Sequence, residues 1–547
     1  MAALAARLQR SGVSVWSIGA LIIAALVLTP ILSVAWLAMS PGAGVWAHLA
    51  ATTLPRYMGN TLILMLSVGA ITASVGTATA WLVTQYRFPG ARWLEWLLLL
   101  PLAIPAYIGA YAVTDLLEYA GPVQTGLRAL FGWHSVRDYW FPEIRSRGAA
   151  VVVLSAALYP YCYLMARAAF REQSVCAHEV ARTLGAGAWR RFHAIALPLA
   201  RPAIAAGTAV AMMETASDFG VVDYFAVQTL TTGIFTTWLQ AGNAAGAAQI
   251  AGVVLLLVFG LMGMEKASRR KMRFYRMSRR QRPMEKVTLR GPGAWAATLA
   301  CLIPVLVGFV LPVSVIGTLA LGNADEWADP ALLRSLGHTL LVAGSASVLT
   351  VTLALFMVYG VRLSGHHLPR ALLPVTTLGY AAPGAVLGLG LLIPMGALDN
   401  RLADAVLALT GYDPGLLMTG SAFAIVIAYV VRFFAIAQGA TDGALGRISP
   451  SLPMAARSLG RSAGGTLRHV HLPLISGSVA TALLLVFVDS VKELPATLLL
   501  RPFNFDTLAT RVYNQASLER IGDAAPPAIL VILVGLAAVL VLARSNR

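Results

Sequence analysis

Long apolar segments separated by short polar ones run the whole length of the chain. A helix needs about 20 predominantly apolar residues to cross the hydrocarbon core of a bilayer. Segments of that length recur often enough to predict an all-α, polytopic membrane protein with about 12 transmembrane helices. The predicted spans are 17–39, 60–84, 93–116, 148–170, 202–225, 246–265, 293–321, 338–361, 370–396, 417–438, 475–499 and 525–543.

The predicted helices divide into two similar sets of six. Short segments recur at a nearly constant offset: Asn60-Thr61-Leu62 as His338-Thr339-Leu340, 103–106 as 381–384, Gly185 as Gly460, Pro198 as Pro473, Glu214 as Asp489, and Asp218 as Glu493. Because each unit has an even number of spans, both units run the same way through the membrane. Such a parallel repeat places a pathway at the interface between its halves.

This repeat predicts three parts of the chain. We expect a first six-span transmembrane domain over residues 1–265 and a second over 293–547, joined by a basic cytoplasmic linker over 266–292. The linker contains the densest run of lysine and arginine in the sequence. A solvated tether near anionic lipid headgroups is the interpretation that this composition favours.

Composition supports the membrane assignment. Hydrophobic residues make up 58% of the chain and charged residues only 12%, whereas soluble domains are closer to 25% charged. The net charge of +17 does not indicate nucleic-acid binding, because the basic residues lie in segments between apolar spans. By the positive-inside rule, this distribution places both termini and the linker in the cytoplasm.

One polar phrase occurs twice, as EVARTLGAGAWRRFHAIALP at 179–198 and as MAARSLGRSAGGTLRHVHLP at 454–473. Each copy predicts a short helix, a glycine break, a second short helix, and a proline near the start of the next span. Such a loop either inserts a helix into a partner's groove or packs on its own protein. The residues that define it are Glu179, Ala181, Leu184, Gly185 and Pro198 in the first copy, and Ala455, Ala456, Leu459, Gly460 and Pro473 in the second.

The spacing Glu-x-Ala-x-x-x-Gly, then nine residues, then Ile-x-Leu-Pro resembles the EAA loop of permease subunits of bacterial ABC importers. The second copy departs from it at Met454, where the acidic residue would stand. The resemblance implies that each loop is a coupling helix that docks on an ATPase subunit. A polar contact made by Glu179 would then have no equivalent in the second loop.

Two longer segments, 197–239 and 488–534, resemble the two halves of fused ferric-iron importer permeases. The resemblance implies a multi-pass protein of the bacterial cytoplasmic (inner) membrane. It also implies two copies of an ABC ATPase subunit and a periplasmic or lipid-anchored iron-binding protein as partners. Thiamine importers use a related fused permease, and no residue here selects ferric iron over thiamine, so ferric iron, thiamine and another small solute all stay open as substrates.

The chain has no motif for its own energy supply. A P-loop requires Gly-x-x-x-x-Gly-Lys-Ser/Thr, and none of the lysines follows a glycine. We therefore expect a transport subunit that is not an enzyme and binds no cofactor, with ATP and Mg²⁺ held by the partner subunits. An ion-coupled secondary transporter is the alternative from a different class.

Acidic residues inside two predicted spans are the candidates for the translocation path. Glu214 and Asp218 are four residues apart in one span, and Asp489 and Glu493 repeat that spacing in the other, beside Lys492. Three interpretations compete: structural residues at the interface, a path for a hard cation that prefers oxygen ligands, and a proton relay. A pathway must release its ion, so no stable metal site is expected.

Overall fold

The computed structural model describes residues 15–39, 45–173, 179–181, 183–270, 286–364, 367–449 and 451–545. Within these ranges, eleven helices are long and apolar enough to cross a membrane, or twelve if one bent pair counts as a span. The prediction of an all-α, polytopic membrane protein is thereby confirmed. The long helices are α2 (Val15–Met39), α4 (Leu54–Gln85), α8 (Arg147–Arg171), α11 (Leu197–Ser217), α14 (Ala244–Arg270), α15 (Pro292–Val305) with α16 (Leu311–Gly322), α18 (Pro330–Ser364), α21 (Gly384–Thr410), α22 (Phe423–Gly446), α25 (Leu472–Val491) and α28 (Ile521–Ser545).

Shorter elements connect the long helices. The short α-helices are α3 (Val45–Ala51), α5 (Ala91–Leu97), α6 (Ala106–Leu117), α7 (Pro122–Phe131), α10 (Ala188–Arg191), α12 (Gly220–Tyr224), α13 (Leu230–Phe235), α17 (Ala324–Ala328), α19 (His367–Leu372), α20 (Leu378–Ala381), α23 (Ser451–Ser458), α24 (Ala463–Thr466), α26 (Pro495–Leu500) and α27 (Leu508–Ser517). Two 3₁₀ turns lie at Leu100–Ala103 and Val136–Asp138, and π-helical turns lie at Phe192–Ala196, Thr236–Gln240, Leu306–Val310 and Leu467–His471.

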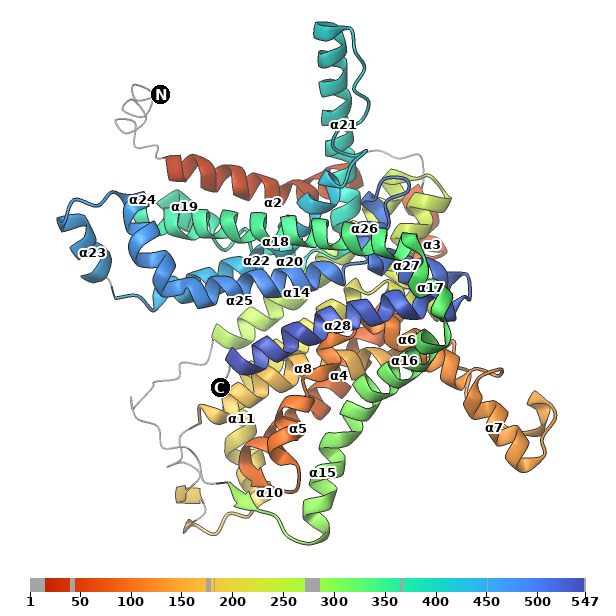
Figure 1. The fold of residues 1–547 in the computed structure, drawn as a ribbon. Coiled ribbons are helices and arrows are strands. Elements are labelled where there is room, and N and C mark those ends of the chain that lie inside the picture. Colours follow the sequence, from red (N-terminus) through yellow and green to blue (C-terminus); the bar gives the residue numbers. More distant parts are fainter. Residues whose placement is uncertain are drawn as a thin grey trace.

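The first span of each half packs on the other half. Helix α2 lies against α18 and α21 of the second half and also against α14 of the first, whereas α15 lies against α4 and α5 (Figure 1). Buried side chains of α15, among them Ala297 and Cys301, share a core with Tyr163 and Phe170 of α8. The first spans therefore add contacts between the two halves.

The third span of the first half is broken, and the prediction of one continuous helix over 93–116 is wrong. The segments Ala91–Ala103 and Ala106–Phe131 meet at an angle of 92°. Pro105 is the N-cap of α6, and it has no N–H to continue a helical ladder through the bend. A hydropathy pattern does not register this break, because both segments are apolar.

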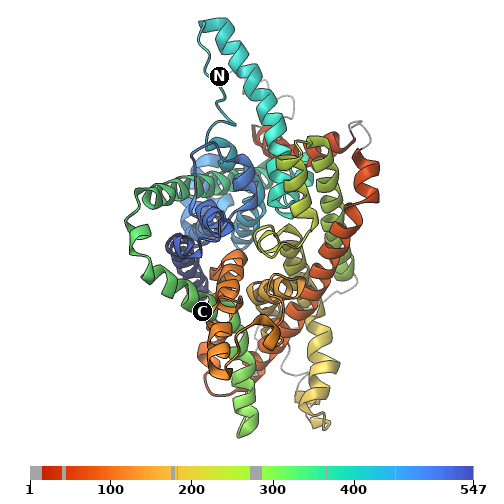
Figure 2. The ribbon, with the colours of Figure 1, turned by 90° about the vertical axis from the view of Figure 1, so that its right-hand side faces the viewer.

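The corresponding segment of the second half is also interrupted, at Pro383, the N-cap of α21. The span predicted over 370–396 therefore begins later, at Gly384, and α21 continues to Thr410. Its outer part protrudes from the bundle (Figures 1 and 2). The buried carboxylate of Asp399 accepts hydrogen bonds from the N–H groups of residues 417–419 and so fixes the following loop to the helix.

The spans predicted over 202–225 and 475–499 end early, at Ser217 and Val491. Each is followed by a short helix, α12 or α26. After these, α13 and α27 are tied to the second span of their own half by the same hydrogen bond. Thr61 Oγ1 accepts from the Leu230 N–H at 3.0 Å, and Thr339 Oγ1 accepts from the Leu508 N–H at 2.8 Å.

The predicted linker 266–292 is described only at its two ends. Its first residues continue α14, and residues 271–285 lie outside the described part. Its last residues form β2 (Val287–Thr288), which pairs in parallel with β1 (Tyr86–Arg87). Lys286 Nζ also donates a hydrogen bond to the Val83 carbonyl at 2.7 Å. This end of the linker is therefore attached to the first half, and the division into two permease domains stays a prediction.

Candidate translocation site and coupling loops

A cavity of about 170 Å³ lies between the two halves, where α11 and α25 end. All four acidic residues predicted for the path line it: Glu214, Asp218, Asp489 and Glu493. Other polar residues of its wall are Tyr107, Tyr161, Tyr380, Arg432 and Lys492. The repeat thus brings the two acidic pairs, which are far apart in sequence, to one place.

The second acid of each pair accepts hydrogen bonds from the first turn of the short helix that follows the break. Asp218 Oδ2 accepts hydrogen bonds from the N–H groups of Val221 and Val222, both at 3.1 Å, in the first turn of α12. Glu493 Oε1 accepts from the Ala496 N–H at 3.2 Å, in the first turn of α26. Free N–H groups at a helix N-terminus stabilise negative charge. These two acids therefore have a structural role at the breaks.

The first acid of each pair makes fewer polar contacts with the protein. In the described part of the chain, Glu214 accepts one hydrogen bond, from the Tyr380 hydroxyl at 3.3 Å. Asp489 has one ion-pair contact there, with Lys492 Nζ at 3.9 Å. Their oxygens keep most of their capacity to accept hydrogen bonds or bind a cation.

The two basic residues of the cavity both come from the second half. Arg432 Nε lies 3.1 Å from Glu493 Oε2, while its buried Nη1 has no hydrogen-bond partner among the described residues. Lys492 Nζ donates a hydrogen bond at 2.8 Å to the Leu102 carbonyl of the first half. Lys492 therefore connects the halves as well as facing Asp489.

Glycine at position 384 makes room for the Arg432–Glu493 pair. A Cβ at Gly384 would collide with Glu493 Oε1 and lie 3.0 Å from Arg432 Nη1. The recurring segment around Pro105 and Pro383 thus contributes directly to the cavity. The sequence alone did not show this role, nor that of Arg432 or Tyr380.

The tyrosines of the sequence do not behave alike. Tyr111, Tyr159 and Tyr163 are fully buried in the apolar cores. Tyr107 is buried as well, but it lines the cavity; its hydroxyl, like those of Tyr111 and Tyr159, has no hydrogen-bond partner among the described residues. Such an orphaned buried hydroxyl is unusual and needs a specific explanation.

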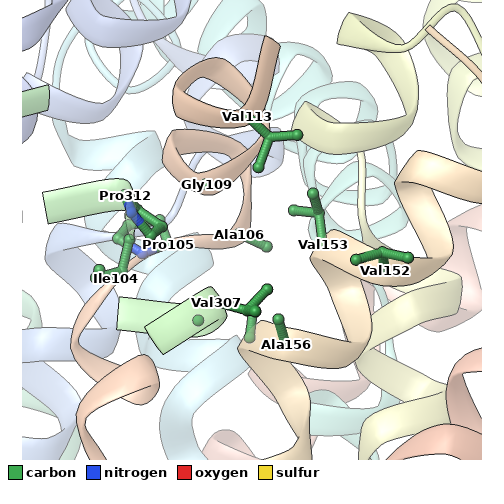
Figure 3. A pocket seen from close by; sticks show the side chains of 12 residues that line it. Ile104, Pro105, Ala106, Gly109, Val113, Val152, Val153, Ala156, Val307 and Pro312 are labelled. Carbon is green, nitrogen blue, oxygen red and sulfur yellow. The ribbon is translucent and has the colours of Figure 1, made fainter. Parts of the chain in front are cut away.

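A smaller cavity, of about 30 Å³, adjoins the first beside Pro105 and Ala106. Figure 3 shows its wall, which is formed by apolar side chains such as Val153, Val307 and Pro312. It offers no polar side chain to a ligand. We therefore assign it to packing around the broken third span.

The two repeated loops have the same backbone conformation. Gly185 has φ +78° and Gly460 has φ +79°, in the left-handed region that favours glycine. The N–H of the next residue returns to the carbonyl five positions earlier in both, from Ala186 to Ala181 at 2.9 Å and from Arg461 to Ala456 at 3.1 Å. This is the Schellman helix end, and it confirms the predicted glycine break.

Each loop presents a leucine just before its glycine. Leu184 is 81% exposed and Leu459 is 83% exposed. Glu179 and its counterpart Met454 are exposed too, as is Ala455, whereas Ala456 is buried. Pro198 and Pro473 lie in the first turns of α11 and α25. Figure 1 places α10 and α23 at the end of the bundle where α2 begins and α28 finishes, so both loops lie at that end.

The halves also meet at the opposite end of the bundle, where α27 lies. Tyr513 donates a hydrogen bond to Asp223 Oδ2 at 2.7 Å. Arg145 pairs with Glu519 at 3.0 Å and with Glu118 of its own half at 2.8 Å. Polar contacts between the halves therefore close this end of the interface.

The described part of the chain contains no group of three or more His, Cys, Asp or Glu residues positioned to hold a metal ion. The four cavity acids are therefore not arranged as a cage. Asp218 and Glu493 accept hydrogen bonds at the helix breaks. Glu214 and Asp489 line a cavity that Arg432 and Lys492 also line.

Residues 66–274 match the family described as binding-protein-dependent transport system inner membrane component. The Fe(3+)-transport system permease protein FbpB 2 of Haemophilus influenzae is 26% identical over 491 residues, which cover 88% of this chain and 88% of that protein. The ferric transport system permease protein FbpB of Actinobacillus pleuropneumoniae is 24% identical over 492 residues, covering 86% of this chain and 67% of that protein.

A shorter relative matches only part of the chain. The molybdenum transport system permease protein ModB of Escherichia coli is 29% identical over 213 residues, which cover 38% of this chain and 90% of that protein. A permease of that length is about the size of one of the two units here. The chain is therefore similar, over most of its length, to inner-membrane permeases of ferric-iron transport systems, and the eleven or twelve candidate spans of its described residues fit a multi-pass membrane protein of this kind.

Proposed function

We propose that this permease moves ferric iron into the cytoplasm, using ATP hydrolysis by partner ATPase subunits. The observation that carries the proposal is the similarity to ferric-iron permeases over most of the chain. The cavity between the halves is consistent with it, because its free acids offer the hard oxygen ligands that a ferric ion prefers.

The proposed path runs through this cavity. Glu214 and Asp489 face it with few internal partners, whereas Asp218 and Glu493 hold the helix breaks around it. Transient contacts with the first two acids would let an ion enter and leave, as conduction requires. On this proposal the chain holds no stable metal and no cofactor.

The two repeated loops are the proposed coupling sites, one for each of two ATPase copies. Their equal glycine conformations and exposed leucines present two similar apolar contacts at one end of the bundle. An exposed apolar side chain at the tip of a short helix suits insertion into a groove. ATP-driven movement of the partners would then rock the halves relative to one another.

Assigning the loops as coupling sites also determines how the protein is oriented in the membrane. The loop end would face the cytoplasm, together with both termini, and the end with Tyr513 and Asp223 would face the periplasm. A periplasmic or lipid-anchored iron-binding protein would deliver its cargo there. The distribution of basic residues supports the same orientation.

The two alternatives have less support. A thiamine permease would share the coupling loops, but the relatives that cover most of the chain are named for ferric iron. An ion-coupled secondary transporter would not need the two repeated loops, and residues 66–274 match a family of binding-protein-dependent transport systems.

The test is uptake of radiolabelled ferric iron by iron-starved cells that lack this gene and redundant iron importers. Wild type should restore uptake, and Gly185→Trp should not, although it should reach the membrane in normal amounts. Unchanged iron uptake in the deletion strain would overturn the iron assignment. Thiamine uptake would then be measured in the same strains.

A further inference from the structure

We propose that Trp81 and Tyr359 are positioning residues that pass movement of the two coupling loops to the second spans, and that the two halves do this by different contacts. This proposal rests on the proposed function and specifies how the docked loops act on the membrane helices. The two residues lie near the ends of α4 and α18. They occupy the same position of the repeat, at the offset that also relates Asn60 to His338 (359 − 81 = 338 − 60).

The second short helix of each loop is continuous with a long span. Residues Ala188–Ser217 form one helix that includes α10 and α11, and Ala463–Val491 form another that includes α24 and α25. A displaced loop therefore moves α11 or α25 directly, and these are the helices that end at the acidic pairs of the cavity. Whether α4 and α18 move with them depends on side contacts with the loops.

In the first half this side contact is aromatic packing. The Trp81 ring lies 5.2 Å from the ring of Phe192 in the loop and 5.3 Å from that of Phe170 in α8, measured between centroids. Aromatic pairs attract each other at such separations over a range of ring angles. The equivalent positions of the second half, Leu467 and Leu445, are not aromatic. The second loop therefore needs a different contact.

In the second half the contact is a hydrogen bond. The Tyr359 hydroxyl donates to the Ala463 carbonyl, in the first turn of α24, at 2.6 Å. Its ring also lies edge-on to His471 at the end of the loop, with centroids 5.3 Å apart. A hydrogen bond weakens steeply when its angle or length changes. The second loop is thus held to α18 by a directional contact, whereas the first is held to α4 by packing.

Both positions also reach the leading helix of the other half. Trp16 of α2 lies edge-on to the Tyr359 ring, with centroids 5.6 Å apart. At the equivalent position, Ala294 of α15 belongs to the buried core on which Trp81 packs. A shift at either residue therefore acts on both halves, as a rocking movement of the halves requires.

Tyr359→Phe tests the second half with a minimal change. It removes the hydroxyl and keeps the ring that contacts Trp16 and His471, so folding and docking of the ATPase should not change. Loss of one hydrogen bond should lower the uptake of iron per ATP hydrolysed about fivefold, or about 1 kcal/mol of coupling.

Trp81→Leu tests the first half, and it should also lower uptake per ATP. Phe192→Leu removes the same ring contact from the loop and introduces the residue type found at position 467. Because either change alone removes the contact, the double variant should lose little more than Trp81→Leu. Trp81→Leu combined with Tyr359→Phe should instead multiply the two losses, since the two contacts lie in different halves.

The experiment uses the full-length permease with its ATPase subunits and iron-binding protein in proteoliposomes, and measures radiolabelled iron uptake and ATP hydrolysis together. Tyr412→Phe, an exposed tyrosine in the loop after α21, is the matched control. Melting in detergent and co-purification of the ATPase check that each variant folds and docks. A second readout does not depend on the cargo: ATP-dependent labelling of Ser217→Cys on the cavity wall, without the native cysteines.

A fivefold lower uptake per ATP in Tyr359→Phe, with normal melting and co-purification, would support the proposal. Wild-type uptake per ATP in both Tyr359→Phe and Trp81→Leu, or a loss explained by weaker ATPase association, would overturn it. The cargo assignment fails separately: if wild type carries no iron, a labelling change that ATP induces in wild type but not in Tyr359→Phe still supports the positioning role. An equal labelling change in the two proteins refutes that role.

Discussion

The Tyr513 hydroxyl donates a 2.7 Å hydrogen bond to Asp223 across the interface between the two halves. The Arg145–Glu519 pair bridges the same end of the bundle. A permease that opens alternately at its two ends must break both contacts when this end opens. We therefore propose that these contacts form a latch, which holds this end closed in one state and separates in the other.

The latch leads to the first prediction. Joining Asp223→Cys to Tyr513→Cys with a bifunctional methanethiosulfonate reagent, in a background without the native cysteines, should block iron uptake by holding this end closed. Reductant should restore uptake, and each single cysteine should transport normally after the same treatment. Full uptake by the cross-linked double variant would show that this end does not need to open.

The exposed leucines of the coupling loops give the second prediction. Leu184→Asp and Leu459→Asp should each weaken association with the ATPase subunits by about 30-fold, the loss of about 2 kcal/mol expected for an interface anchor. Co-purification with the ATPase measures the effect, and membrane abundance should not change. Leu409→Asp is the control, because Leu409 is as exposed but lies at the protruding end of α21. Normal co-purification of both loop variants would contradict the docking role.

Gly384 gives the third prediction. Gly384→Ala places a methyl group against the Arg432–Glu493 pair and should destabilise the protein by about 1–3 kcal/mol, the usual cost of overpacking. Thermal unfolding in detergent measures the loss. Gly396→Ala on the same helix is the matched control, since a Cβ there meets no atom within 4 Å. Equal melting temperatures for the two variants would show that the space at position 384 is not needed.

The fourth prediction concerns Ala226, which has φ +56° just after α12. An alanine in this left-handed region costs about 1–2 kcal/mol, and the equivalent turn of the second half has Asn504 at φ +62°. Ala226→Gly should therefore raise the stability by about 0.5–1 kcal/mol, after allowing for the entropy of glycine. Ala209→Gly, inside α11, should do the reverse. A lower melting temperature for Ala226→Gly would contradict the strain at this turn.

The sequence predicted the features that depend on apolar length and on the repeat. Spans such as 148–170 and 246–265 correspond closely to α8 and α14, because a single uninterrupted helix needs only sustained hydrophobicity. The repeated spacing of the acids also predicted two matching pairs in two spans. The structure adds that α11 and α25 both end at these pairs.

Other features were not accessible from the sequence, for identifiable reasons. The bend at Pro105 lies between two apolar segments, so hydropathy continues across it. The difference between Asp218, which accepts backbone hydrogen bonds, and Glu214, a free acid, depends on where α11 ends. Arg432 has no counterpart in the repeat: position 157, at the same offset as the acids (432 − 157 = 489 − 214), is alanine.

The first span of each half helps to hold the two halves together. Helix α2 packs on α18 and α21 of the second half as well as on α14 of the first, and α15 packs on α4 and α5 of the first half, so separating the halves would expose both leading helices. Arg432 and Lys492 both belong to the second half. A pairing of two first halves would therefore bring the acids together without either counter-charge. Because both halves are part of one polypeptide, every transporter contains one Arg432 and one Lys492 beside the four acids. The two halves can therefore differ in the charges that they contribute to the cavity.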